Sequence, residues 1–252
     1  MIWMKGKEKI RIWAAVFWLC VWQAGSMALG QKILLVSPVL AVRRLLELAI
    51  TAPFWQSVGF SLLRVAAGFL AAAILGVLLA ALAVRFIRVE ELLSPLMLAI
   101  KTTPVASFII LLLIWISSRN LSVYISFLMV LPVIYTNVRD GIRATDQKLL
   151  EMAQVFRVPA GRVTRYIYLS QVLPFFRAAC SVALGLCWKA GVAAEVIGIP
   201  QGSIGEMLYN AKIYLNTPDL FAWTLTIILL SLAFERLVLA GLDWGAKRLE
   251  RM

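Results

Sequence analysis

Histidine is absent from this chain of 252 residues, and charged residues make up only 15% of it. Histidine is the commonest general base and the commonest metal ligand, so its absence removes the simplest routes to catalysis and metal binding. A Ser/His/Asp triad is excluded, and the chain contains no Gly-x-x-x-x-Gly-Lys-Ser/Thr phosphate-binding loop. The sequence therefore predicts no catalytic, cofactor-binding or metal-binding residues.

Cysteine is also scarce. The chain has three, Cys20, Cys180 and Cys187, and each lies in an apolar run with no second cysteine at CxxC spacing. This pattern disfavours a disulfide framework or a zinc site. We interpret the three side chains as small buried hydrophobic groups.

Apolar residues dominate what remains, at 62% of the chain with a mean hydropathy of +0.88. Soluble domains are nearer half apolar and about a quarter charged, so the composition predicts an integral membrane protein. The net charge of +12 would suggest nucleic acid in a soluble protein. In a membrane protein it fits cytoplasmic loops that face anionic lipid, so we expect membrane lipid and no nucleic acid as a partner.

Six apolar segments are long enough to cross a membrane, which takes about 20 residues. The run after the basic start resembles a signal peptide, but it continues to Leu29 and further apolar segments follow, which favours an uncleaved first span. The sequence thus predicts an all-α polytopic membrane protein with one transmembrane domain over 1–252. The predicted spans are 12–29, 57–84, 96–117, 121–138, 172–195 and 220–241, and the third and fourth form a tight hairpin.

Lysine and arginine are unevenly distributed between the loops. With the N-terminus inside, the inner segments hold fifteen of these residues and the outer segments five. Positive charge accumulates on the cytoplasmic side, so we expect both termini in the cytoplasm. Residues 37–56 then lie outside, where Ser37 followed by Pro38 predicts the start of a short interfacial helix.

Small residues recur every four positions in the second span, at Gly68, Ala72, Gly76 and Ala80. Such a stripe lets another helix approach closely, and the fifth span is rich in alanine and glycine too. We expect both helices to pack against protein and not only against lipid.

Residues 151–174, EMAQVFRVPAGRVTRYIYLSQVLP, interrupt the apolar runs with a basic, amphipathic segment inside the predicted cytoplasmic loop 139–171. Arg157 and Val158 should break a first short helix, because a residue before proline is pushed out of helical geometry. A second helix is expected to start at Pro159, and Pro174 to open the fifth span. From the residues alone, the segment is either an anchor in lipid headgroups or a docking element for a cytoplasmic partner.

This segment resembles the EAA loop of bacterial ABC importer permeases, whose pattern is Glu-Ala-Ala, three residues, Gly, nine residues, then Ile-x-Leu-Pro. Glu151, Ala153, Ile167 and Leu169 match, whereas Arg157 replaces the usual glycine. Met152 replaces the first Ala of the pattern, and Ser170 replaces its final Pro. Four longer blocks are similar to the nitrate/sulfonate/taurine subfamily: SPVLAVRRLLEL, SVGFSLLRVAAGFLAAAILGVLLAALAV, SPLMLAIKTTPVASFIILLLIW and LGLCWKAGVAAEVIG.

The resemblance implies a type I ABC importer fold and a homodimer in the bacterial inner membrane. It also implies two cytoplasmic ATP-binding cassette subunits, which hydrolyse the ATP, and an extracytoplasmic substrate-binding protein. The EAA loop would be the coupling helix that fits a cleft on each ATPase. The coupling residues carried over to this sequence are Glu151, Ala153, Arg157, Pro159, Gly161, Arg162 and Arg165.

Arginine at position 157 affects the backbone conformation expected where the loop turns between its two short helices. Glycine there would permit a left-handed conformation without steric cost. We expect that the arginine does not adopt it and that Val158–Pro159 makes the kink instead, with Arg157 free to contact the ATPase or lipid headgroups.

Ionisable residues inside spans are candidates for the translocation path, here Arg64, Lys101, Lys189 and Glu195. Three cations would suit an anionic solute such as a sulfonate, taurine or nitrate. In the alternative, these cations pair with acids or extend to an interface.

Two other functions stay open on the sequence. One is the scaffolding subunit of an energy-coupling vitamin importer, which also docks ATPases through basic cytoplasmic helices. The other is a carrier that uses no ATPase, although the repeated broken helices that would support it are not evident.

Overall fold

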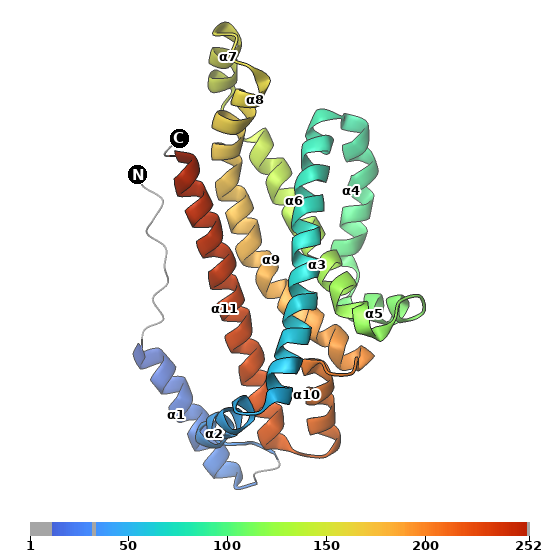
Figure 1. Ribbon diagram of the computed structural model, residues 1–252, viewed down its shortest axis with the longest axis vertical. Coiled ribbons are helices and arrows are strands. Elements are labelled where there is room, and N and C mark those ends of the chain that lie inside the picture. The colour runs from blue at the N-terminus through green and yellow to red at the C-terminus, as the bar shows by residue number, and fades with distance from the viewer. Residues whose placement is uncertain (1–11, 32–33, 251–252) are drawn as a thin grey trace. The chain divides into compact units, whose positions relative to one another are not determined.

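The computed structural model describes residues 12–31 and 34–250, and Figure 1 shows that its elements are helices. The basic start of the chain, which contributes to the predicted orientation, lies outside these residues. The described elements are α1 (Ile12–Leu29), α2 (Pro38–Ala49), α3 (Ala52–Arg85), α4 (Ile87–Thr102), α5 (Val105–Leu113), α6 (Ser118–Arg143), α7 (Gln147–Val155), α8 (Ala160–Val163), the π-helical turn η1 (Thr164–Tyr168), α9 (Leu169–Gly198), α10 (Ile204–Ile213) and α11 (Thr217–Glu250).

Four of these helical stretches are long and apolar enough to cross a membrane: α3, α6, the run Ala160–Gly198, and α11 as far as Ala246. The bent pair α4 and α5 adds a fifth if it is counted as one span. The predicted first span corresponds to α1, whose apolar part Val16–Leu29 is shorter. The all-α, polytopic membrane fold is confirmed.

The predicted third span over 96–117 contains a sharp bend. The chain instead begins α4 at Ile87 and bends by 101° between α4 and α5. Thr103 lies at the bend with extended dihedrals, φ −78° and ψ 130°. It precedes Pro104, whose ring excludes the helical region for the residue before it and which lacks an N–H to continue the helix.

The predicted boundary at Pro174 is also wrong. Ala160–Gly198 is one helical run of 39 residues, in which α8 passes through η1 into α9, and Pro174 lies inside α9. Much of the predicted loop 139–171 is therefore helical. A proline removes only one backbone donor, and a wide π-turn placed earlier in the run accommodates local strain without ending the helix.

The chain divides into two compact units. The smaller unit holds the described residues up to Trp55 together with residues 207–226, and α2 is its clearest element. The predicted start of α2 is confirmed, because Ser37 caps it by accepting a hydrogen bond from the Leu40 N–H at 3.3 Å. Arg44 of α2 pairs with Asp219, and this hydrogen bond, followed by that to Glu47, raises the pKa of the arginine above its ordinary value.

The larger unit holds residues 56–206 and 227–250. Within it the predicted small-residue stripe is confirmed as a packing surface: Gly68, Ala72, Gly76 and Ala80 are all buried. A Cβ added at Gly76 would lie 2.9 Å from Ile134 Cγ2 of α6. The helices α6 and α9 run side by side (Figure 1), with Ile125 and Ala190 in their shared core.

Candidate functional site

The first part of the site is the helix α7, which carries the EAA-like residues. Asp146 caps its start, because Asp146 Oδ1 accepts from the Lys148 N–H at 2.9 Å. The Asp146 N–H donates in turn to Gln171 Oε1 of α9, also at 2.9 Å. The start of α7 is thus tied directly to α9, the helix that crosses the membrane.

A Schellman turn ends α7. The Val158 N–H donates to the Ala153 carbonyl at 2.8 Å and the Arg157 N–H to the Gln154 carbonyl at 3.0 Å. Arg157 occupies the left-handed position of this turn with φ +50°. The usual glycine of the family pattern falls at this position, and the expectation that Arg157 avoids the left-handed conformation is wrong. The hydrogen bonds that close the turn offset its steric cost.

Pro159 directly precedes α8 with φ −57°, so the second helix begins within one residue of the predicted start. Gly161 and Arg162 are exposed on its first turn, and Arg165 is exposed in η1. Arg157 is exposed at the junction of α7 and α8. Three arginines and a glycine are therefore exposed within residues 157–165.

The outer side of α7 is apolar and uncovered in the protomer. Val155 is 79% exposed, Phe156 74% and Met152 48%, whereas Ala153 is only 4% exposed beneath them. Glu151 is exposed beside this group. We call Met152, Val155 and Phe156 the α7 apolar surface. Figure 1 shows α7 projecting past the ends of α3 and α4, so these elements do not cover it.

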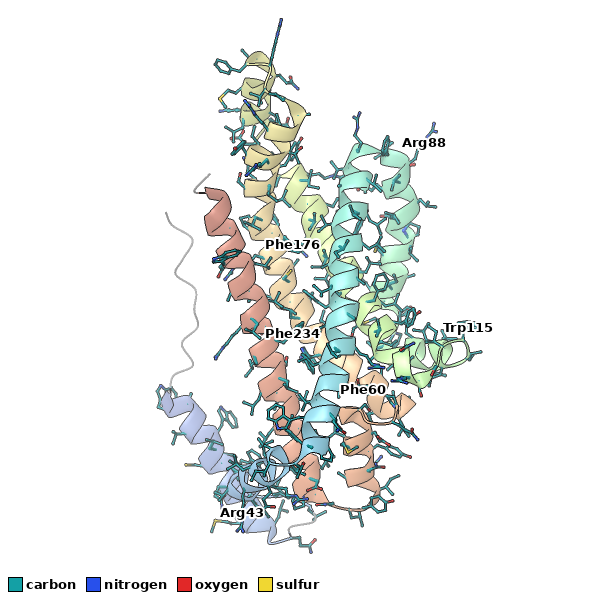
Figure 2. All side chains as sticks on the ribbon, viewed as in Figure 1. Arg43, Phe60, Arg88, Trp115, Phe176 and Phe234 are labelled. Carbon is teal, nitrogen blue, oxygen red and sulfur yellow. The ribbon has the colours of Figure 1, made fainter. Side chains whose placement is uncertain are left out.

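The predicted path residues do not form one cluster. Arg64 of α3 donates from Nε to the Arg119 backbone carbonyl at 2.5 Å, and its guanidinium lies 3.6 Å from the centre of the Phe60 ring. Phe60 is labelled in Figure 2. These contacts hold Arg64 between α3 and the start of α6.

Glu195 of α9 is fully buried. Its Oε2 accepts from Ser61 Oγ at 2.6 Å and from the Gly205 N–H at 3.4 Å, while the Ile204 N–H donates to Ser61 Oγ at 3.0 Å. A carboxylate and a hydroxyl thus satisfy backbone donors at the start of α10. The arrangement connects α3, α9 and α10.

Lys101 lies in the last turn of α4, just before the bend, and donates from Nζ to Thr136 Oγ1 of α6 at 2.9 Å. Lys189 lies on a face of α9 that is exposed in the protomer, with Val182, Leu186 and Ile197. Among the described residues, neither lysine forms an ion pair with an acid. For Lys101 and Lys189, the alternative interpretation that the cation pairs with an acid is therefore not supported within the described part of the protomer.

Sequence reasoning missed the partners of these charges. Ser61 and Thr136 are polar residues inside spans, and their polarity was the available signal in the sequence. The sequence also showed no sign that Glu90 of α4 forms ion pairs with Arg139, at 3.4 Å, and with Arg143 at the C-terminal end of α6.

Comparison with known proteins matches residues 68–250 to the family described as "Binding-protein-dependent transport system inner membrane component". SsuC of Bacillus subtilis, named for the transport of aliphatic sulfonates, is 30% identical over 87% of this chain and 78% of its own. The nitrate import permease protein NrtB of Synechococcus elongatus is 28% identical over 77% and 72%. The taurine transport system permease protein TauC of Escherichia coli is 23% identical over 85% and 80%.

The family match covers most of the chain, and the apolar helices agree with it. Members of this family are transport proteins and not enzymes themselves. The chain is a multi-pass protein of the bacterial inner membrane and belongs to the inner membrane permease components of ABC importers.

Proposed function

We propose that this chain is the membrane-spanning subunit of an ATP-driven importer and that α7 and α8 dock a cytoplasmic ATP-binding cassette subunit. The observation that carries this is the α7 apolar surface, exposed on a helix whose two ends are fixed by a cap and a Schellman turn. Uncovered apolar side chains of this kind mark interaction sites. Because Asp146 contacts Gln171, movement of α7 on the ATPase would reach α9 directly.

The docking assignment explains the charges beside the surface. Glu151 and Arg162 are exposed, and the deep apolar contacts would supply affinity while these charges set the register. A lipid anchor would bury the same apolar side chains. The exposed Glu151 beside them favours protein over an anionic headgroup layer, which repels a carboxylate.

The solute we propose is a small anion delivered by an extracytoplasmic binding protein. Relatives are named for sulfonates, nitrate and taurine, which all carry an oxyanion group. Lys189 would serve such a solute, because it lies about 14 Å from the C-terminal end of α9 at roughly 1.5 Å per residue and is exposed. An ammonium at that depth is costly in lipid, so its face is expected to meet water or a second copy of the chain.

A homodimer in which the two α9 faces enclose the path satisfies this requirement. We further propose that both termini are cytoplasmic, which places α7 on the side where ATP is available. Of the other predicted path residues, we assign Arg64 and Glu195 to positioning the helices.

The test uses the chain co-expressed with its ATP-binding cassette subunit. Phe156→Asp and Glu151→Lys should leave the permease folded and inserted, since both side chains are exposed, but should reduce co-purification of the ATPase and solute uptake together. Ile213→Asp is the matched control, because Ile213 is an apolar residue 55% exposed at the end of α10. Docking is refuted if both α7 variants retain the ATPase at wild-type levels.

A further inference from the structure

A cavity of about 300 Å³ lies between α4 and α6 in the larger unit. Its polar lining includes Lys101, Tyr135, Thr136 and Arg139, and Pro95 and Met97 contribute apolar walls. No acidic side chain is among the lining residues. The cavity therefore offers donors and positive charge without a built-in anion.

The Lys101 ammonium has hydrogen-bond donors that are not used within the protomer. Its Nζ makes one hydrogen bond, to Thr136 Oγ1 at 2.9 Å, and an ammonium carries three N–H groups. The Thr136 hydroxyl is itself committed, because it donates to the Pro132 carbonyl at 2.6 Å. Among the described residues no carboxylate pairs with Lys101, so its charge is uncompensated within the protomer.

Tyr135 supplies an independent observation. The side chain is only 1% exposed, and its hydroxyl has no hydrogen-bond partner among the described residues. Buried polar groups nearly always have a partner, because leaving one without costs about 1–3 kcal/mol. Tyr135 is among the residues that line the cavity, so its buried hydroxyl without a partner points to an acceptor that reaches it through the cavity.

Arg139 adds charge at the inner end. Its guanidinium carbon lies 5.7 Å from the centre of the Tyr135 ring. It pairs with Asp140 at 2.8 Å and with Glu90 at 3.4 Å, so much of its charge is already balanced. Lys101 and the Tyr135 hydroxyl are therefore the groups left to bind a ligand.

We propose that this cavity binds a small oxyanion, a sulfonate, sulfate or phosphate group, with Lys101 and Tyr135 as its donors. Oxyanions accept several hydrogen bonds at once, and a lysine ammonium is a common partner for them. Thr136 lies about 10 Å from the end of α6 at Arg143, at roughly 1.5 Å per residue. The site is therefore within reach of the side of the membrane where α7 lies.

Two sources share this chemistry. One is the transported solute on its way to the cytoplasm, and this reading rests on the proposed function. The other is the phosphate of an anionic lipid whose headgroup enters between α4 and α6. Both require the same donors, so one set of variants tests the site and two probes separate the sources.

The experiment uses the full-length chain in a non-ionic detergent, with inorganic sulfate and ethanesulfonate as soluble probes and dihexanoyl phosphatidylglycerol as the lipid probe. Binding is measured as the shift in thermal unfolding with probe concentration, because a ligand that binds only the folded state raises stability by mass action. We expect Lys101→Met and Tyr135→Phe each to weaken binding about tenfold or more, as for the loss of one hydrogen bond to a charged group. Lys212→Met is the control, because Lys212 is exposed on α10 and far from this lining in sequence. It should bind as the wild type does.

The Tyr135→Phe variant also distinguishes a loss of binding from a loss of folding. It removes only an unpartnered hydroxyl, so without probe the variant should melt at or above the wild-type temperature. Binding of the soluble probes supports the solute reading, and binding of the lipid alone supports the lipid reading. The site is refuted if the wild type binds no probe, or if both variants bind like the control. Unchanged uptake in the Phe156→Asp variant would instead count against the proposed function, so the two failures are distinct.

Discussion

Ser61 Oγ lies 2.6 Å from Glu195 Oε2, and both side chains are fully buried. The pair joins α3 to α9, and the Gly205 N–H at the start of α10 completes it. A lone carboxylate in a membrane interior is costly, and these donors satisfy Glu195 Oε2, whereas Oε1 has no hydrogen-bond partner among the described residues.

The first prediction concerns this pair. Glu195→Ala should lower the unfolding temperature markedly, because it leaves the Ser61 hydroxyl and the Gly205 N–H short of an acceptor, at about 1–3 kcal/mol per group. Glu195→Gln keeps an acceptor oxygen and should lose less. Thermal unfolding in detergent measures both. A Glu195→Ala protein that melts normally but fails in uptake would assign Glu195 to the path instead.

The second prediction concerns the end of α7. Arg157→Gly should stabilise this turn by about 1 kcal/mol, because glycine adopts the left-handed region without steric cost. The same replacement at Arg162, a residue of α8, should destabilise by about as much, since glycine is a poor helix former. Amide hydrogen exchange over residues 147–163 reports both changes. If both variants stabilised the segment, or both destabilised it, the result would contradict the Schellman turn.

The third prediction concerns Lys189. Lys189→Met should preserve expression, dimerisation and ATPase association but cut solute uptake sharply, because the path loses its cation. Lys189→Arg should keep part of the uptake, since the charge remains. Lys212→Met serves as the control. Loss of the dimer in Lys189→Met would make the residue structural and remove an argument for an anionic solute.

The fourth prediction concerns orientation. In a Cys20→Ser background, cysteine at Asn120 or Tyr214 should react with an impermeant thiol reagent added outside intact cells, and cysteine at Gln154 should not. All three native positions are exposed in the protomer, so reactivity reports the side of the membrane and not burial. Labelling at Gln154 alone would invert the topology and the docking proposal with it.

The sequence by itself determined the membrane class and most helix positions, because both depend on local properties. Apolar length decides whether a segment leaves water, and Ser37 before Pro38 sets a helix start through a contact three residues away. The same holds for the stripe from Gly68 to Ala80, whose small residues predict close packing whichever helix is the partner.

The tertiary structure decided what each polar group contacts. Pro104 follows the 101° bend between α4 and α5, whereas Pro174 lies inside α9, although the local rule for the residue before proline is the same for both. Arg157 takes a left-handed conformation because the hydrogen bonds of the turn outweigh its intrinsic preference. Lys101 meets Thr136 across 35 positions of sequence, and Ser61 meets Glu195 across 134. Spacing along the chain carries no record of such distances, since they arise only when separate helices pack together.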